Sequence, residues 1–225
     1  MFVIVMAAST AAIASNCPDG DRMLLNNTPL SQVCPNGFGQ FKPGSIANAM
    51  AAQSDNVKMI TAAAQEQGVP VDLALAVSYH ESEGFNSCAG SDTGVKGPMQ
   101  LTQSTGRAYG YNRDINEQNI KGGMAVLKAA YDKCGATNFA CLSANYNGSP
   151  RPGEQAGWAN GVQKANQELK GNPQLLASAC AGSPDAAQCE LGPGGFGPGT
   201  PNVAAASAPR NATITLANDI TPPGA

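Results

Sequence analysis

Charged residues are scarce in this chain of 225 residues, in which Asp, Glu, Lys and Arg together make up 13%. The 13 Lys and Arg residues are outnumbered by 16 Asp and Glu residues, so the formal net charge is −3 at pH 7. Nucleic-acid-binding domains carry clustered basic charge that neutralises phosphates. The charge balance therefore excludes nucleic acid as an expected partner.

The N-terminal segment MFVIVMAASTAAIASNC is apolar, but its apolar part is too short to cross a bilayer as a helix, which takes about 20 residues. We therefore expect no stable membrane span. The segment has a short apolar region and a candidate cleavage motif at Ala12-Ile13-Ala14, which is typical of a secretory signal, although a Lys or Arg near the start is lacking. We predict a signal peptide at residues 1–14 and a periplasmic or secreted protein. The alternative is a buried or truncated start.

Histidine is nearly absent, since His80 is the only one in the chain. A metal site or a nucleophile–histidine arrangement would need further ligands or partners at suitable spacing around it, and the sequence shows none. We therefore expect no metal and no other cofactor.

Cysteine, in contrast, occurs seven times, mostly at short spacings, which favours disulfides and an oxidising compartment. The sequence does not fix the connectivity, because six cysteines allow 15 pairings. The favoured pairs, which leave Cys88 alone, are Cys17 with Cys34, Cys134 with Cys141, and Cys180 with Cys189. The alternative is a set of free buried thiols.

Two helices are predicted in the first half of the chain. NVKMITAAAQEQ, capped by Ser54 or Asp55, has apolar residues on one face and ends at Gly68. VDLALAVSYHES, which Pro70 and Asp72 open, has almost no polar face, so we expect this second helix to be largely buried.

Further helices are predicted after a Gly- and Ser-rich segment, NSCAGSDTGVKGPMQLTQSTG, which is expected to form a loop or a short strand pair. EQNIKGGMAVLKAAYDKC, capped by Asn116, has apolar residues at helical spacing. NFACLSANYN is a shorter helix, and EQAGWANGVQKANQELKG ends at Gly171 and Pro173.

These patterns divide the chain into four predicted segments. Residues 1–14 form the signal peptide, residues 15–51 an irregular Cys-containing lead-in, and residues 52–172 the folded domain. Residues 173–225, rich in Gly, Pro and Ala, form a flexible, disordered tail with too few apolar residues to pack.

Two glutamates lie at the end of the buried helix. Glu81 and Glu83 point to opposite sides of a helix, because two residues correspond to a turn of about 200°. Glu81 follows Leu73 and Val77 on the apolar stripe, near the negative end of the helix dipole, so its pKa should be raised. Glu81 is therefore a candidate general acid. The alternative is that both glutamates are solvated at a fraying helix end.

Four segments, AVSYHESEGFNS, GVKGPMQLTQSTG, INEQNIKGGMAVLK and LSANYNGSP, follow one another within residues 52–166. Together they resemble the lysozyme-like catalytic domain of lytic transglycosylases, in which a Glu-Ser helix end, a Gly-x-Met-Gln turn, an Asn-Ile helix and a Tyr-Asn pair occur in this order. The resemblance implies a mainly α, lysozyme-like α+β fold with a small Gly-rich β or loop region.

The resemblance also implies site residues and a substrate, the glycan strands of peptidoglycan. It makes Glu81 the catalytic acid and base. The substrate-binding residues that it implies are Ser82, Gly97, Met99, Gln100, Tyr146 and Asn147. The chain departs from the family pattern at Pro98, where Leu is usual, and at Asn145, where Ala is usual, which puts the preference for individual sugars in doubt.

The implied reaction cleaves the β-1,4 bond after N-acetylmuramic acid and forms a 1,6-anhydro ring, with one glutamate acting first as acid and then as base. One alternative is a hydrolytic goose-type lysozyme with Asp92 positioning water, and another is a catalytically silent wall-binding assembly protein. Trp158 is expected in the core, with stacking on sugar as its alternative. The format resembles specialised transglycosylases of secretion, conjugation or pilus machines, which implies an assembly component as a second partner.

Overall fold

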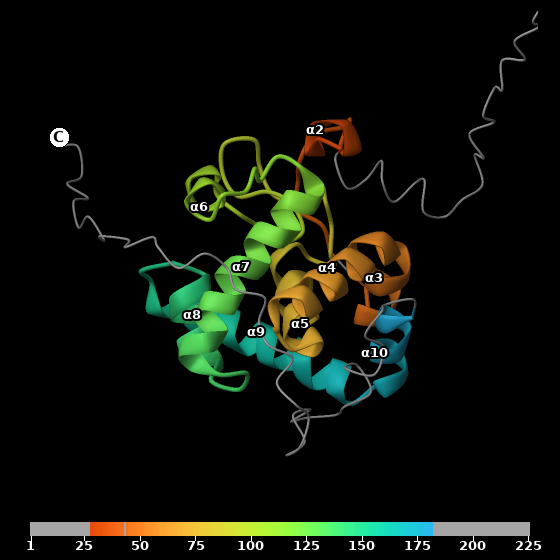
Figure 1. Ribbon diagram of the computed structural model, residues 1–225, viewed down its shortest axis with the longest axis vertical. Helices are drawn as coiled ribbons and strands as arrows, with labels where there is room; N and C mark the ends of the chain where they lie inside the picture. Colours follow the sequence, from red (N-terminus) through yellow and green to blue (C-terminus); the bar gives the residue numbers. More distant parts are fainter. Residues whose placement is uncertain (1–27, 43, 182–225) are drawn as a thin grey trace, which may run out of the picture. The chain divides into compact units, whose positions relative to one another are not determined.

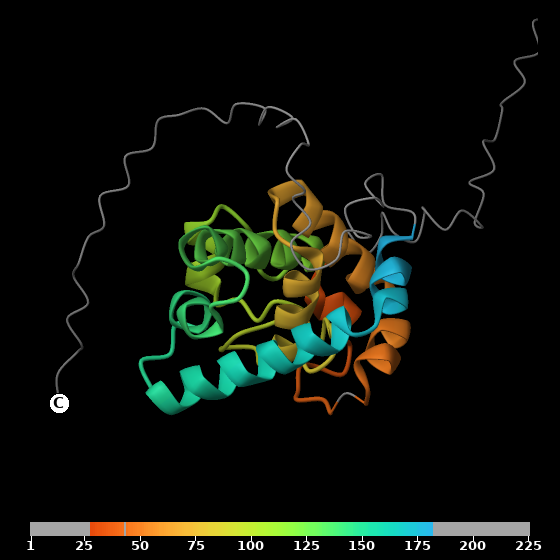
Figure 2. The same cartoon turned by 90° about the horizontal axis from the view of Figure 1, so that it is seen from below.

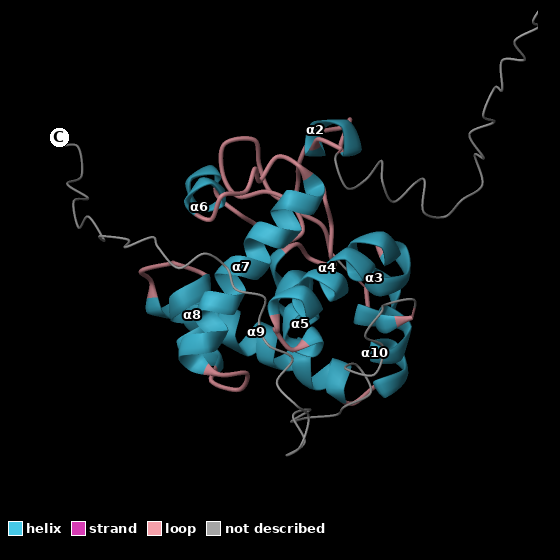
Figure 3. Cartoon of the chain, in the orientation of Figure 1, coloured by secondary structure: helices cyan, strands magenta, loops and turns pink. Residues whose placement is uncertain are grey.

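The computed structural model describes residues 28–42 and 44–181, which are mostly helical, as the sequence predicts (Figure 1). The predicted signal peptide, Cys17 and Cys189 lie outside the described residues, as does most of the predicted tail. Figure 3 shows that loops, rather than strands, join the helices of the described part. The helices are α2 (Leu30–Val33), α3 (Ile46–Ala52), α4 (Ser54–Gln67), α5 (Val71–Glu81), α6 (Gln103–Ala108), α7 (Asn116–Cys134), α8 (Phe139–Tyr146), α9 (Pro152–Lys170) and α10 (Pro173–Cys180).

Helix α5 is the buried centre of the described part and packs against α4 and α9 (Figure 1). All residues from Leu73 to Val77 are fully buried, because α5 is apolar around its circumference between Asp72 in its first turn and Ser78. Its buried Ser78 donates a hydrogen bond from Oγ to the carbonyl oxygen of Pro98 at 2.9 Å. None of the helices among residues 28–42 and 44–181 is long and apolar enough to cross a membrane.

The predicted helix ends are right for α4 and α5, but the predicted caps differ. Gly68 ends α4 in the left-handed conformation at φ 68°, as its position after the last apolar residue predicts. The residue before α4 is Gln53, which makes no side-chain cap, so the expectation of a Ser54 or Asp55 cap is wrong. Both residues lie inside the first turn.

The expected Asn116 cap of α7 is also wrong, because Asn116 is the first residue of α7 and is fully buried. Its side chain forms a polar network instead. Nδ2 donates to Oδ1 of Asn56 at 2.9 Å, and Oδ1 accepts from Oγ of Ser87 at 2.8 Å. This network joins α4, α7 and the loop after α5, and its members satisfy one another in the core.

Helix α9 runs beneath α5 and connects α8 at one end with α10 at the other (Figure 2). Trp158, Val162, Ala165 and Leu169 recur at helical spacing along α9, and all four are buried. Gly161 lies against the ring of His80 on α5, where a Cβ atom would be only 2.4 Å from two ring atoms. The close approach of α5 and α9 at this point therefore requires glycine.

Four further helices, α2, α3, α6 and α10, lie where the sequence predicts irregular chain. Ser45 caps α3 by accepting from the Asn48 N–H, and Thr102 caps α6 by accepting from the Thr105 N–H. Pro173 opens α10 as its first residue, and α10 packs against α4 and α9. The predicted irregular lead-in and the predicted start of the tail at residue 173 are therefore wrong, because these short helices depend on contacts with the core.

The Gly-rich segment after α5 forms isolated β-bridges and turns. Lys96 pairs with both Gly90 and Leu101, and Gly39 pairs with Ala89. Gly90 has φ 115°, and a Cβ there would lie 2.0 Å from the Val95 carbonyl oxygen, so this tight turn requires glycine. The segment is the small β or loop region that the sequence predicts.

Two disulfides are present among the described cysteines. Cys134 is bonded to Cys141, the pairing that the sequence favours. Cys34 is bonded to Cys88, so the predictions that Cys34 pairs with Cys17 and that Cys88 is alone are wrong. The fold brings the lead-in against the loop after α5, where Gly39 and Ala89 pair, and local spacing cannot reveal this contact. Cys180 is disulfide-bonded, but its predicted partner Cys189 lies outside the described residues.

We predict that the two disulfides differ in their contribution to the free energy of unfolding. Cys34–Cys88 closes a sequence separation of 54 residues and Cys134–Cys141 one of 7. In the chain-entropy model the longer loop is worth about 4 kcal/mol and the shorter about 2.5 kcal/mol. Urea unfolding of the two double Cys→Ser variants should rank them in this order. Equal losses, or the reverse order, would contradict the entropic account.

Candidate active site

Glu81 is the last residue of α5, and its side chain is partly buried. The indole Nε1–H of Trp158, on α9, donates a hydrogen bond to Oε1 of Glu81 at 2.6 Å. The contact spans 77 residues of sequence and joins the two helices that pack most extensively on each other. The structure thus places the predicted catalytic carboxyl between α5 and α9, and not at a frayed, solvated helix end.

Burial raises the pKa of the Glu81 carboxyl to about 7, whereas the hydrogen bond from Trp158 acts in the opposite direction and lowers it. Removal of water disfavours the charged form, and a donor to the carboxylate favours it. Among residues 28–42 and 44–181, no neighbouring charge contributes to this shift. Near neutral pH the group is therefore divided between its acid and carboxylate forms, which suits a residue that must give and take a proton.

Tyr146, at the end of α8, lies beside this pair. Its ring stacks on Trp158 with the centroids 5.7 Å apart and the planes at 29°, and its hydroxyl donates to the carbonyl oxygen of Met99 at 3.0 Å. Burial, followed by the charge of Glu81, raises the pKa of Tyr146 well above its ordinary value. Tyr146 is therefore a neutral phenol close enough to Glu81 to be affected by its charge.

Glu83 has a different environment from Glu81, but it lies beyond the end of α5, so the helical geometry that the sequence suggests does not apply to it. It lies after α5 with φ 50°, and its Oε2 accepts a hydrogen bond from the backbone N–H of Phe41. Glu83 is partly buried and ties the turn after α5 to the lead-in, so it does more than face water. The two carboxylates thus have separate tasks.

Ser82, which the resemblance places among the substrate-binding residues, is 0% exposed. Its Oγ donates to the Ser78 carbonyl oxygen at 2.8 Å and accepts from the Asn86 N–H at 2.9 Å. Both hydrogen bonds are internal to the fold, and substrate binding by Ser82 stays a prediction. Ser82 fixes the turn that ends α5 directly after Glu81.

The segment from Gly97 to Gln100 is held by Asn119 of α7. Oδ1 of Asn119 accepts from the Met99 N–H at 3.1 Å, and Nδ2 donates to the Lys96 carbonyl oxygen at 2.8 Å. Gly97 has φ 77°, and a Cβ there would lie 2.7 Å from the Asn119 side chain. The glycine of the predicted Gly-x-Met-Gln turn is therefore required by packing and conformation.

Met99 and Gln100 have unlike roles within that turn. The Met99 side chain is 0% exposed and fills the space left by Gly123 of α7, where a Cβ would lie 2.2 Å from it. The Met99 side chain therefore packs in the core, and its place among the substrate-binding residues stays a prediction. Gln100 is partly exposed at φ 47°, and its Nε2 donates to the carbonyl oxygens of Ala89 and Gly97 at 2.9 and 2.8 Å.

Asn147 and Asn145 flank Tyr146 at the end of α8. Asn147 is partly buried and is the C-cap residue, with its N–H bonded to the Ser143 carbonyl oxygen at 3.0 Å. Asn145, where the family usually has Ala, accepts from Nζ of Lys133 at 2.9 Å. These contacts orient the end of α8, and through it the Tyr146 ring.

The hydrogen bond from Trp158 to Glu81 is a feature of the site that the sequence does not reveal. The Trp158 side chain is 5% exposed, as expected for a core residue, but its one polar atom reaches Glu81. His80 lies edge-on to the same ring, with centroids 6.1 Å apart, and burial lowers the pKa of His80. The helical stripe predicts burial of Trp158 but not the direction in which its N–H points.

Asp92, the residue considered for a hydrolytic mechanism, lies in the Gly-rich loop with its side chain 81% exposed. Its Oδ1 lies 3.4 Å from Nζ of Lys96, which also pairs with Asp114 at 3.2 Å. These ion pairs account for Asp92 without a catalytic task.

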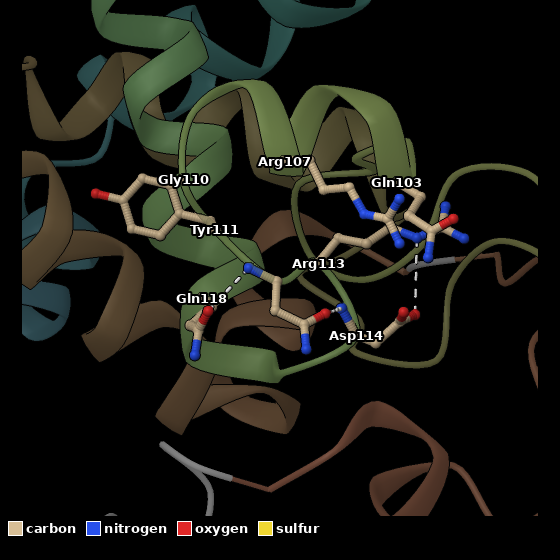
Figure 4. Close-up of a pocket in the computed structure, with 8 residues that line it drawn as sticks. Gln103, Arg107, Gly110, Tyr111, Arg113, Asp114 and Gln118 are labelled. Carbon is tan, nitrogen blue, oxygen red and sulfur yellow. Dashed lines mark hydrogen bonds and ion pairs between the residues drawn. The ribbon is translucent and has the colours of Figure 1, made fainter.

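A separate cavity of about 500 Å³ lies between α6 and the start of α7 (Figure 4). None of the predicted site residues lines it. Its buried Arg113 is engaged with the backbone, since Nη1 donates to the Leu101 carbonyl oxygen at 3.1 Å and Nη2 to that of Asp92 at 3.4 Å. The lining residues are Gln103, Arg107, Gly110, Tyr111, Asn112, Arg113, Asp114 and Gln118.

Comparison with known families agrees with the arrangement around Glu81. Residues 58–169 match the family model described as Transglycosylase SLT domain. These residues belong to that family. The SLT domain runs from α4 to the end of α9 and contains Glu81, Tyr146 and Trp158. The family resemblance read from the sequence is thereby confirmed.

Curated relatives of the SLT domain are named membrane-bound lytic murein transglycosylase F. The protein from Aeromonas hydrophila subsp. hydrophila is 41% identical over 66 residues, which cover 29% of this chain and 13% of the relative. The Saccharophagus degradans protein is 37% identical over 94 residues, covering 40% and 19%. The chain thus spans less than a fifth of the length of these relatives. No solved structure matches the chain significantly.

We predict that Glu81→Gln stabilises the SLT domain at alkaline pH. The folded-state pKa of about 7 lies above the ordinary value of 4.5, so the folded protein binds the proton more tightly than the unfolded chain. The stabilisation that Glu81 contributes is therefore fully present below pH 4.5, and up to about 3 kcal/mol of it is lost as the pH rises through 7. Glutamine is never charged and avoids this loss.

Urea unfolding of the parent and the Glu81→Gln variant at pH 4.5 and pH 8.5 measures the difference. The variant should exceed the parent at pH 8.5 and approach it at pH 4.5. A variant that is no more stable than the parent at pH 8.5 would show that water solvates the carboxylate.

Proposed function

We propose that this chain is a peptidoglycan lytic transglycosylase that cleaves the bond between N-acetylmuramic acid and N-acetylglucosamine and forms 1,6-anhydro-N-acetylmuramic acid. The observation that carries the proposal is the carboxyl of Glu81, which accepts the Trp158 N–H between α5 and α9 of an SLT domain, where burial raises its pKa to about 7. The curated relatives are named as murein transglycosylases, which supports the same substrate.

The first step requires an acid. The protonated Glu81 carboxyl donates its proton to the glycosidic oxygen, so the leaving sugar departs as an alcohol and positive charge develops at the anomeric carbon. Glu81 becomes a carboxylate. In the mechanism that the family resemblance implies, the N-acetyl group of the substrate stabilises the positive centre.

The second step requires a base. The Glu81 carboxylate removes the proton of the sugar's C6 hydroxyl, whose oxygen attacks the anomeric carbon and closes the anhydro ring. The carboxyl is protonated again and ready for the next cycle. Because no water enters the bond, the product is lighter than a hydrolysed one by one water.

The environment of Glu81 supports a mechanism with one carboxylate. Retaining glycosidases place a second carboxylate about 5 Å from the acid, and its charge would raise the pKa of the acid. Burial raises the pKa of Glu81 without any contribution from a neighbouring charge in the described part of the chain. Asp92 is exposed and paired with Lys96, which disfavours the hydrolytic alternative.

The proposed substrate lies outside the cytoplasmic membrane, so we propose a periplasmic or secreted location. The two disulfides of the described residues support it, because such bonds persist in oxidising compartments. The partner in a secretion, conjugation or pilus machine remains a prediction from the sequence format.

The test is the product released from purified peptidoglycan, identified by mass spectrometry. The parent should release anhydro-muropeptides. Glu81→Gln keeps the size and the acceptor for Trp158 but removes the proton donor, so the rate should fall by at least about 100-fold. A hydrolysed product would make the enzyme a lysozyme, and equal lysis by parent and variant would refute catalysis by Glu81.

Glu83→Gln is the matched control for this experiment. It makes the same chemical change two residues away, and the glutamine oxygen can still accept the Phe41 N–H. The control should keep the rate of the parent within about twofold, because Glu83 has a structural role.

A further inference from the structure

The hydrogen bond between Trp158 and Glu81 constrains where the catalytic proton resides. An indole N–H can donate but cannot accept. Oε1 of Glu81, 2.6 Å from Nε1, must therefore act as an acceptor in both the charged and the neutral form of the carboxyl. The carbonyl oxygen of a carboxylic acid accepts a hydrogen bond better than its hydroxyl oxygen does, so in the neutral form this contact favours the acid proton on the other oxygen, Oε2.

We propose that Trp158 is a positioning residue that assigns the catalytic proton to Oε2 of Glu81. This inference rests on the proposed function and deepens it, because it names the oxygen that performs both proton transfers. Oε2 donates the proton to the glycosidic oxygen in the first step. The same atom receives the proton of the C6 hydroxyl in the second.

Two aromatic rings hold the indole in place. Tyr146 stacks on one side of Trp158 at 5.7 Å, and His80 lies edge-on at 6.1 Å with the planes at 90°. The Tyr146 hydroxyl is fixed in turn on the Met99 carbonyl oxygen. Gly161 leaves the space that His80 occupies. The indole therefore cannot turn its N–H away from Glu81 without disturbing α5, α8 and the Met99 turn.

The contact also favours the chemistry energetically. After proton donation Glu81 carries a negative charge, and a hydrogen bond to a charged acceptor is stronger than one to a neutral acceptor. Trp158 thus stabilises the carboxylate that forms as the glycosidic bond breaks. Loss of this donor should slow the reaction even if the carboxyl stays in place.

A role in packing alone would give Trp158 the same burial, so the test must remove only the N–H. Trp158 is the only tryptophan in the chain, so an analogue supplied during expression enters the full-length protein at this position alone. 3-Benzothienylalanine has the shape of tryptophan but carries sulfur where the N–H stands. 4-Fluorotryptophan, which keeps the N–H, is the matched control.

With 3-benzothienylalanine, kcat on peptidoglycan should fall by roughly 10- to 100-fold, as expected for a lost bond to a charged group, while KM stays within twofold. The pH–rate profile should move to higher pH, since the removed donor favours the carboxylate. The fluorinated control should keep the profile of the parent. If the sulfur analogue keeps both kcat and the pH profile of the parent, the proposal is overturned.

A measurement on the unmodified protein does not depend on folding of the analogue protein or on activity. Fluorescence of the lone indole should change with pH around a midpoint of about 7 as Glu81 ionises, and this change should be absent in Glu81→Gln. Emission without such a transition in the parent would overturn the proposal. If the parent releases no anhydro product but shows the transition, the proposed function fails while the Trp158 contact to Glu81 stands.

Discussion

The candidate active site depends on the carboxyl group of Glu81, which is partly shielded from water and accepts a hydrogen bond from the indole N–H of Trp158. Burial between α5 and α9 holds the proton on Glu81 up to about pH 7, while Trp158 keeps the pKa from rising further. Either influence alone would give a weaker reagent, because a fully exposed glutamate is already ionised at neutral pH and an unassisted buried one gives up its proton reluctantly. The pKa of Glu81 is set by these two opposing influences, burial and the Trp158 hydrogen bond.

The surrounding elements hold Glu81 and Trp158 in position. Ser82 ends α5 directly after Glu81, and Asn119 holds the turn whose Met99 carbonyl oxygen anchors Tyr146. Left-handed backbone is unusual for non-glycine residues and occurs at Glu83, directly after α5, and at Gln100, in the turn that Asn119 holds. Such conformations tend to occur at functional sites, where the surrounding structure enforces them.

The sequence predicts those features that depend on local pattern. Apolar periodicity predicts α4, α5, α7, α8 and α9, and the position of Glu81 on the apolar stripe predicts its burial and raised pKa. The Cys34–Cys88 bond and the helices α3 and α10 were missed, because they depend on contacts between segments distant in sequence. The direction of the Trp158 N–H could not be predicted for the same reason, because its partner Glu81 lies 77 residues away in the sequence.

The central claim is that Glu81 holds its proton far above the ordinary range of a carboxylic acid. NMR titration of protein labelled with ¹³C at the glutamate side-chain carboxyls measures it directly. We expect one carboxyl resonance to titrate near pH 7 and to be missing from the Glu81→Gln spectrum. If the resonance assigned to Glu81 titrates between about pH 4 and 5, like an exposed glutamate, the account is contradicted.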